Sequence, residues 1–274
     1  MVTLFFCFII LRFSVRAFTM CDVDKQYRIR KGVEKVIQLK KVRKSYGDFH
    51  LRDITLTINE GVIYGIVGES GSGKSTLLSI LNLTTPIDEG ELVIDGVHCE
   101  TLTKSQQRAL KQEMGMIFQE YHLLNNLTVL ENVHLPLKLK GIKDITKAIY
   151  WLEKVGLSGY HTSYPSQLSG GQKQRVALAR ALVTKPKYIL LDEATSALDE
   201  YNAQLILQVL TEVHTEYQPT IIFVSHDLDK IKTFCQECLI LDKGNISHIV
   251  NVTHHRKDEL LASYPEKAFR RLTT

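Results

Sequence analysis

One stretch of nine residues combines the residue types that bind phosphate. It reads GESGSGKST from Gly68 to Thr76, and it holds three glycines, three serines and one lysine. Glycines let the backbone wrap closely around a ligand, so that successive N–H groups point into one concavity that suits an anion. Gly68 and the run GKS that begins at Gly73 fit G-x-x-x-x-G-K-[ST], the P-loop motif that binds nucleotide phosphates.

The flanks of this stretch predict a strand before it and a helix after it. VIYGIV (62–67) is short, apolar and β-rich, and LLSILNL (77–83) is an apolar run with the length of a short helix. The helix start adds the positive end of its dipole, Lys74 adds a full charge, and Ser75 offers a hydroxyl to Mg²⁺. A flexible Gly/Ser linker is the alternative, but linkers do not usually lie between an apolar strand and an apolar helix. We therefore predict nucleotide contacts from the whole loop, namely Gly68, Glu69, Ser70, Gly71, Ser72, Gly73, Lys74, Ser75 and Thr76.

Two acidic residues follow a second apolar strand, YILLD (188–192). Asp192 ends this strand, and ligands of α/β sheets bind beyond the carboxyl ends of the strands, where a carboxylate can hold Mg²⁺. Glu193 follows at once and is suited to orienting or deprotonating an attacking water. The alternative is an acid pair that stabilises a helix start. The P-loop in the same chain favours the catalytic interpretation.

A second helix start also has the features of an anion site. In LSGGQKQRVALARAL (168–182), Ser169 is a natural N-cap, and two glycines follow it before a run of strong helix formers. An S-G-G run alone also fits an ordinary junction between a loop and a helix. Two phosphate-type helix starts in one chain are unusual, however.

Composition sets broad limits on the class of protein. With 274 residues, 44% hydrophobic and 23% charged, the chain is long and apolar enough to bury a core. Its net charge of +4 is too mild to indicate a nucleic-acid partner. Five scattered cysteines indicate a reducing compartment. Cys235 and Cys238 form a C-x-x-C, but no second ligand pair lies nearby, so we expect two half-buried small residues rather than a metal or redox site.

Both ends of the chain are expected to lie outside the fold. The apolar run 2–11 is shorter than the roughly 20 residues that span a bilayer. It also lacks the cationic region and the cleavage site of a secretory signal. We expect residues 1–35 to be an extension with Met20 as a candidate start; a membrane-surface anchor is the alternative. Residues 251–274 are expected to form a short tail.

The remaining patterns predict an α/β fold for residues 36–250. Strands are expected at 36–67, a hairpin at 91–98 with its turn at Asp95-Gly96, and a strand at 115–118. A helical block follows at about 120–182, with its helical pattern starting at Leu123. Strands and helices then alternate, with strands at 188–192 and 220–226, helices at 200–214 and 227–235, and a hairpin at 238–250. We therefore expect a mainly parallel, P-loop (RecA-like) core, an antiparallel β layer and an inserted helical subdomain.

Taken together, these motifs resemble those of the ATP-binding subunits of ATP-binding-cassette (ABC) transporters, over about residues 36–246. GESGSGKST resembles the Walker A motif, YILLDE the Walker B motif with the catalytic glutamate, and LSGGQ the family signature. Four single residues match further family positions: Gln119 the Q-loop, Asp199 the D-loop, His226 the switch histidine and Tyr46 the aromatic that stacks on adenine.

The resemblance implies an ATPase that uses ATP and Mg²⁺. Its catalytic residues would be Glu193, His226 and Gln119, and its metal ligands Ser75, Gln119 and Asp192. Two copies would sandwich two ATP molecules, so that the signature of one copy faces the P-loop of the other; the residues concerned are Ser169, Gly170, Gly171, Gln172 and Asp199. The expected partners are a second copy and an integral-membrane permease, and the expected place is the cytoplasmic face of the cell membrane.

Longer stretches resemble the methionine importer ATPases in particular, among them LNLTTPIDEGELVIDG and YPSQLSGGQKQRVALARAL. FQEYHLLNNLTVLENVHLPL also resembles lipoprotein-release, macrolide-export and cell-division ATPases. Those relatives usually read D-E-P-T-G-N-L-D, whereas this chain has DEATSALD, which favours amino-acid import with an extracytoplasmic substrate-binding protein. The alternative is an export ATPase or a non-transport ABC regulator of a membrane partner. A function in DNA repair or on the ribosome is disfavoured, because the sequence contains no zinc module or long coiled coil of the kind those relatives carry.

Two departures and one surface carry further expectations. Glu200 stands where a proline commonly follows the D-loop aspartate. The short tail leaves no room for the regulatory domain of many methionine importer ATPases, so we expect no inhibition by free methionine. The segment EYHLLNNL (120–127) is expected to border a groove that docks a permease helix, the alternative being that its leucines are core.

Overall fold

The computed structural model describes residues 36–47 and 49–252. The expected N-terminal extension, and the expected tail from residue 253 onward, lie outside these described residues. The elements named below are those of the described part of the chain.

A six-stranded sheet in the order β10-β9-β3-β8-β7-β6 forms the centre. Its strands are β3 (Ile63–Val67), β6 (Met114–Ile117), β7 (Tyr188–Asp192), β8 (Thr220–Val224), β9 (Glu237–Asp242) and β10 (Asn245–Asn251). All neighbours pair in parallel except β9 and β10, which pair antiparallel. Every residue of β3 and of β8 is buried, as expected of parallel strands that are covered on both faces.

Alternate residues of these strands contribute to two different cores, because successive side chains of a strand point to opposite faces. Ile189 and Leu191 of β7 pack in a cluster with helices α4 to α8. Tyr188 and Leu190 of the same strand pack in the other cluster, with helix α2 and the second sheet. The central sheet therefore separates two cores.

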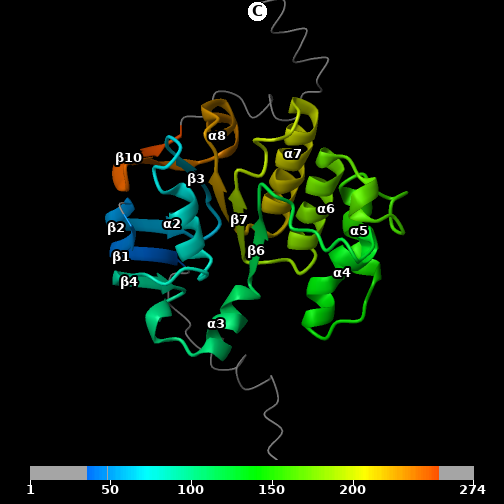
Figure 1. Ribbon diagram of the computed structural model, residues 1–274, viewed down its shortest axis with the longest axis horizontal. Helices are drawn as coiled ribbons and strands as arrows, with labels where there is room; N and C mark the ends of the chain where they lie inside the picture. Colours follow the sequence, from blue (N-terminus) through cyan, green and yellow to red (C-terminus); the bar gives the residue numbers. More distant parts are fainter. Residues whose placement is uncertain (1–35, 48, 253–274) are drawn as a thin grey trace, which may run out of the picture. The chain divides into compact units, whose positions relative to one another are not determined.

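The second sheet is antiparallel, in the order β2-β1-β4-β5. Its strands are β1 (Val36–Tyr46), β2 (Phe49–Asn59), β4 (Glu89–Ile94) and β5 (Val97–His98). Asp95 and Gly96 both have positive φ, 53° and 74°, which forms the tight turn expected between β4 and β5. The leucines of helix α2 belong to the same buried cluster as the apolar residues of this sheet, and Figure 1 draws α2 beside β1 and β2. The predicted antiparallel layer and its hairpin are confirmed.

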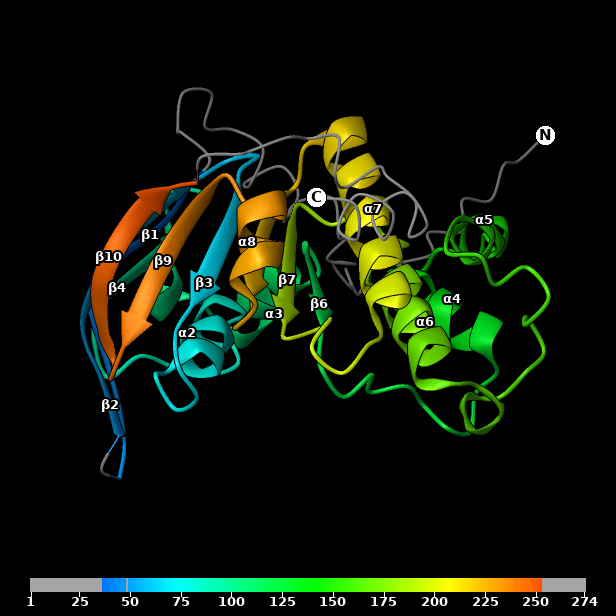
Figure 2. The ribbon, with the colours of Figure 1, turned by 90° about the horizontal axis from the view of Figure 1, so that it is seen from above.

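The helices are α2 (Lys74–Leu81), α3 (Lys104–Lys111), α4 (Val129–Leu139), α5 (Thr146–Lys154), α6 (Gly170–Leu182), α7 (Glu200–Tyr217) and α8 (Leu228–Phe234). Two short 3₁₀ turns, η1 (Cys99–Thr101) and η2 (Pro165–Gln167), complete the elements. In Figures 1 and 2, α4, α5 and α6 group together beyond β6 and β7, on the side away from α2. They form the helical block that the sequence predicts.

The helical block begins later than expected, at Val129 rather than Leu123. Thr128 and Glu131 form a capping box: the Thr128 hydroxyl accepts from the Glu131 N–H at 3.2 Å, and the Glu131 carboxylate accepts from the Thr128 N–H at 2.8 Å. The buried Asn132 amide bonds to the backbone of Leu124 and Leu127. These contacts stabilise a loop ahead of α4, so helical periodicity from Leu123 was a wrong prediction.

Candidate nucleotide site

Three loops of the candidate site meet at one edge of the central sheet. The P-loop follows β3, the pair Asp192-Glu193 ends and follows β7, and His226 follows β8. Strand β8 lies between β3 and β7, and the three strands are parallel. Their carboxyl ends therefore lie at the same edge, where ligands of α/β sheets bind.

The P-loop conformation requires glycine at two positions for different reasons. A Cβ on Gly68 would lie 2.3 Å from the Leu241 carbonyl oxygen, which is too close for any side chain. Gly73 has φ of 105° and is the N-cap of α2, and a Cβ there would lie 2.6 Å from the Phe49 ring. No side chain caps this helix start. Its first N–H groups therefore point into the loop without a side-chain acceptor, as an anion site needs.

Lys74 places a buried cation across the loop. The residue is only 6% exposed, and its Nζ donates to the Gly68 and Glu69 carbonyl oxygens, at 2.9 Å each. The same Nζ lies 3.8 Å from a carboxylate oxygen of Glu193. These contacts hold the curve of the loop and bring the positive charge close to the acids after β7.

Ser75 and Asp192 face each other across the site. The Ser75 hydroxyl donates to Asp192 Oδ1 at 3.1 Å. Burial raises the pKa of Asp192, although the hydrogen bond from Ser75 and the charge of Lys74 oppose the shift. A hydroxyl and a carboxylate are hard oxygen ligands, and Mg²⁺ commonly uses one or two such protein ligands together with water and phosphate oxygens. The two side chains therefore fit a magnesium site.

Glu193 has a strained backbone. Its φ of 46° is in the left-handed region, which costs a non-glycine residue of order 1–3 kcal/mol. Hydrogen bonds from the Glu193 N–H to the Val224 carbonyl and from Ser196 to the Glu193 carbonyl fix this conformation. The carboxylate then lies 3.4 Å from Nδ1 of His226 and is 24% exposed. In this conformation the Glu193 carboxylate lies between Lys74, at 3.8 Å, and His226, at 3.4 Å.

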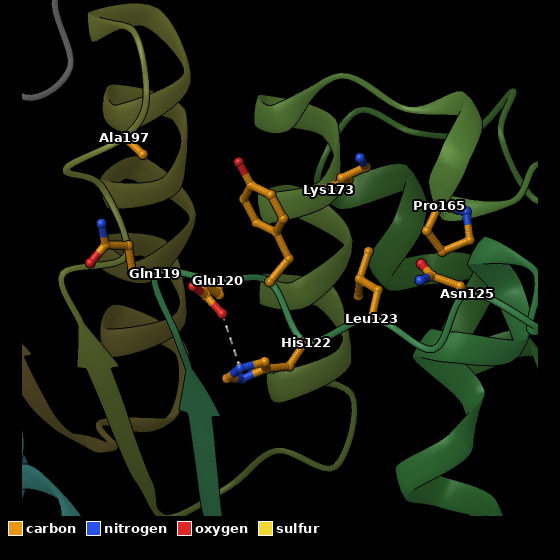
Figure 3. Close-up of a pocket in the computed structure, with 9 residues that line it drawn as sticks. Gln119, Glu120, His122, Leu123, Asn125, Pro165, Lys173 and Ala197 are labelled. Carbon is orange, nitrogen blue, oxygen red and sulfur yellow. Dashed lines mark ion pairs between the residues drawn. The ribbon is translucent and has the colours of Figure 1, made fainter.

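Gln119 follows β6, which pairs in parallel with β7, so it lies at the same edge of the sheet, where it lines a cavity of about 460 Å³. Figure 3 shows Gln119 beside Ala197 on one side of this cavity, with Lys173, Pro165 and Asn125 across from them. This is the groove that the sequence predicts beside residues 120–127. Leu123 packs against the core, as the alternative interpretation has it, whereas Leu124 is 44% exposed.

Helix α6 holds the segment that lines this groove. Gln174 Nε2 donates to the Phe118 carbonyl oxygen at 3.2 Å, and Arg180 donates to the carbonyl oxygens of Tyr121 and His122 at 2.9 and 2.6 Å. The sequence analysis missed Gln174 and Arg180. They join residues about 56 to 59 positions apart, a separation that no local pattern reveals.

The signature segment is at the start of α6, where its polar residues bond to each other and its glycines lie against Tyr121 and Asn202. The Ser169 hydroxyl accepts from the Gln172 N–H at 3.3 Å, and Gln172 Oε1 accepts from the Ser169 N–H at 2.9 Å. A Cβ on Gly171 would lie 2.5 Å from the Asn202 side chain, and one on Gly170 would lie 2.8 Å from the Tyr121 hydroxyl. Figures 1 and 2 place α6 beyond β6 and β7 as seen from α2. A single chain therefore does not bring the signature to its own P-loop.

Tyr46 and Asp199 complete the predicted set. Tyr46 ends β1 with its side chain half-exposed, and its hydroxyl donates to Thr85 Oγ1 at 3.3 Å. Asp199 is the N-cap of α7 and accepts from the N–H and the side-chain amide of Asn202, both at 2.8 Å. Asn202 thus touches both the D-loop aspartate and Gly171. Its spacing of three residues from Asp199 is the signal that could have indicated this role.

Cys235 and Cys238 lie in the core, around one glycine of the central sheet. They are buried rather than half-buried, at 0% and 3% exposure, and both sulfurs flank Gly65 of β3. Burial raises the pKa of both thiols, that of Cys238 to about 11. Within residues 36–47 and 49–252, no group of three His, Cys, Asp or Glu side chains is placed to hold a metal ion. In the same part of the chain, no helix has the length and apolar character needed to cross a membrane.

Comparisons with known proteins agree with this geometry. A family model described as ABC transporter matches residues 51–196. The chain is 43% identical over 236 residues to the methionine import ATP-binding protein MetN of Vibrio cholerae. The aligned region covers 82% of this chain and 69% of that protein. It is 44% identical over 199 residues to the methionine import ATP-binding protein MetN 1 of Listeria monocytogenes, covering 72% of this chain and 59% of that protein. The chain thus spans about 60 to 70% of the length of these relatives.

Two solved structures have the same fold. A dimeric structure of a post-hydrolysis state of the ATP-binding cassette MJ0796, bound to ADP and Pi, has a TM-score of 0.74 and 34% sequence identity to this chain. A second dimeric structure of MJ0796, described as a bacterial ABC transporter cassette, has the same TM-score and identity. Each comparison covers 80% of this chain and 100% of the other.

Proposed function

The chain belongs to the ABC transporter family, and on that premise we propose that it is the ATP-hydrolysing subunit of an importer of methionine or a related amino acid. The observation that carries the ATPase part is the grouping of Lys74, Ser75, Asp192, Glu193 and His226 beyond three adjacent parallel strands. The amino-acid part rests on the printed names of the relatives and on the DEATSALD segment.

Each residue of the group has a distinct task in this proposal. The P-loop amides and Lys74 bind the phosphates of ATP, and Ser75 and Asp192, with Gln119, hold the Mg²⁺ that accompanies it. Glu193 orients or deprotonates the attacking water. His226, at 3.4 Å from Glu193, orients that carboxylate. Phosphoryl transfer depends mainly on such positioning and on electrostatic stabilisation.

A second copy of the chain completes the site. The signature residues Ser169 to Gln172 and the D-loop Asp199 of one copy face the nucleotide on the P-loop of the other. The placing of α6 away from α2 supports this arrangement, as do the dimeric cassettes that share the fold. Closure on ATP and opening after hydrolysis then produce the motion that drives transport.

An integral-membrane permease docks at the groove beside Gln119, on the cytoplasmic face of the cell membrane. The groove is lined by both apolar and polar side chains, which suits a surface that binds a partner helix. An extracytoplasmic protein supplies the substrate. Leu124→Glu, at the exposed side of the docking segment, should reduce co-purification of the permease while ATP binding is retained. Leu139→Glu is the matched control, since Leu139 is 73% exposed and ends α4, outside the segment 120–127.

Transport itself tests the proposal. The chain would be co-purified with its membrane subunit and reconstituted in vesicles, with the chain and ATP inside the vesicle. ATP-dependent uptake of labelled methionine, lost with Glu193→Gln, is the expected result. ATP hydrolysis that drives export, or that responds to no amino acid, would favour the export or regulatory alternatives.

A further inference from the structure

The tip of the Tyr46 ring is tied to the helix that begins at Lys74. The Tyr46 hydroxyl donates to Thr85 Oγ1, and that oxygen also accepts from the Ser79 hydroxyl at 3.0 Å. The Thr85 N–H donates to the Ser79 carbonyl oxygen at 3.1 Å. Ser79 lies on α2, so a short relay links Tyr46 to the phosphate-binding helix.

One carboxylate holds the backbone that immediately precedes Tyr46. Asp88 Oδ1 accepts from Lys44 Nζ at 2.6 Å, and Oδ2 accepts from the Ser45 N–H at 2.8 Å. The Asp88 N–H donates to the Arg43 carbonyl oxygen at 3.0 Å. Asp88 thus bonds to the residues that come immediately before Tyr46. Hydrogen bonds from Lys44 and Ser45 also hold the pKa of this carboxyl below its ordinary value.

Lys44 contacts the ring as well as the carboxylate. Its Nζ lies 5.2 Å from the centroid of the Tyr46 ring, within the range of a cation–π interaction, and Lys44 is only 8% exposed. Tyr46 itself is 51% exposed, which leaves ring surface for a ligand. A buried cation therefore supports a ring that remains accessible.

We propose that Lys44, Thr85 and Asp88 are positioning residues that hold Tyr46 at a set distance from the P-loop, so that one nucleotide spans both. The proposal rests on the proposed function, because the ring is taken to stack on the adenine of ATP. The segment 85–88 joins the ring to α2 at one end and to β1 at the other. In this proposal the segment 85–88 does not bind phosphate; it increases the affinity for the adenine base.

The size of the effect follows from preorganisation. Immobilising one side chain on binding typically costs about 2- to 10-fold in affinity, a cost that a prepositioned ring avoids. Complete loss of the stacking ring in Tyr46→Ala should cost more, about 5- to 150-fold. Asp88→Asn and Lys44→Met should fall in the smaller range. Asp88→Asn and Lys44→Met act on one contact. The double variant should therefore bind ATP no more weakly than the single variant with the lower affinity.

Two ligands separate base binding from phosphate binding. Affinities of the purified chain would be measured for Mg-ATP and for Mg-tripolyphosphate, which has no base. Asp88→Asn and Lys44→Met should lower the affinity for Mg-ATP by about 2- to 10-fold. The affinity for Mg-tripolyphosphate should change less than about 2-fold. The ATPase KM should rise while kcat stays unchanged. Glu89→Gln is the matched control, because Glu89 follows Asp88 in the sequence and its exposed carboxylate pairs with Arg43 at 2.8 Å.

The outcomes are distinct. Wild-type ATP affinity in Asp88→Asn and Lys44→Met, with a loss only in Tyr46→Ala, would overturn the proposal, as would equal weakening of both ligands. If Asp88→Asn does not fold, as judged by thermal melting, Thr85→Val tests the other anchor with the same ligand pair and the same expectation. A wild-type chain that binds neither ligand would contradict the proposed function itself.

Discussion

The starts of helices α2 and α6 look alike in sequence and differ in structure. Each combines glycines with a serine, which come before Lys74 in α2 and at residues 169–171 in α6, and each has the features of an anion site. The start of α2 has no side-chain cap, and the buried Lys74 lies beside it. The start of α6 is capped by its own Ser169 and Gln172, and its glycines lie against Tyr121 and Asn202.

This difference indicates that the two helix starts have different tasks. The α2 site has its cation, Lys74, its acids, Asp192 and Glu193, and the hydroxyl of Ser75 within one chain. The α6 start offers amides and a hydroxyl but no charged side chain in its capping box. It is suited to recognising a phosphate that another chain already holds. The predictions below test this division, from the largest expected effect to the smallest.

Glu193→Gln should have the largest effect on the α2 side. The substitution keeps the shape of the side chain and removes its charge and basicity. Loss of a general base typically lowers the rate by about 10²–10⁴-fold. ATP affinity should stay near the wild-type value, because Lys74 and the loop amides bind the phosphates. Steady-state ATPase and equilibrium binding assays measure the two effects, and hydrolysis at the wild-type rate would show that Glu193 is only a structural acid.

Lys74→Ala should weaken nucleotide binding rather than the chemical step alone. A hydrogen bond to a charged group is worth roughly 10- to 150-fold in affinity. Lys185→Ala is the matched control, because Lys185 makes an exposed ion pair with Glu216 at 2.7 Å, away from the loop. Binding of labelled ATP to each variant is the measurement. Retained affinity in Lys74→Ala would place the phosphate site elsewhere.

Gly171→Ala tests the α6 side. A Cβ would press on Asn202, which also binds the D-loop Asp199, so the helix start should shift. We expect ATPase activity to fall roughly tenfold while ATP binding is unchanged, because a small misplacement of a positioning group can cost up to about 10²-fold in rate. Gly159→Ala is the control, since a Cβ there meets no atom within 4 Å. Equal loss of ATP binding and hydrolysis would contradict the division between the two helix starts.

The smallest effect concerns pH and the capping boxes of the helical block. The box of α6 uses Gln172, whereas that of α4 uses Glu131, whose pKa is lowered by hydrogen bonds from the Thr128 backbone and side chain. A lowered folded pKa contributes stability above the unfolded value near 4.5, and this stability is lost as pH falls below it. Urea midpoints of wild type should therefore fall more steeply than those of Glu131→Gln between about pH 5 and pH 3. Parallel curves for the two proteins would exclude this contribution.

Local patterns predicted much of this molecule. The P-loop, the acids after β7 and the N-cap at Ser169 each depend on residues close in sequence, and the α/β P-loop fold and the ABC transporter family are confirmed. The late start of α4 was also readable, because T-x-x-E at Thr128 is a capping-box pattern.

Other features depend on contacts that the local sequence does not contain. Lys44 and Asp88 lie 44 positions apart and meet only because β1 pairs with β4. Gln174 and Arg180 reach carbonyl groups whose position depends on tertiary packing. Cys235 and Cys238 are fully buried because both pack around Gly65 on a neighbouring strand. The roles of the individual site residues remain predictions.

The mass of the Glu193→Gln variant in the presence of Mg-ATP tests the central claim most directly. If a second copy completes the site, a variant that binds ATP and does not hydrolyse it should accumulate as a dimer. Sedimentation should then give twice the chain mass of 31.2 kDa, while Lys74→Ala stays at one chain mass under the same conditions. A Glu193→Gln chain that is saturated with ATP and remains a monomer would contradict the account.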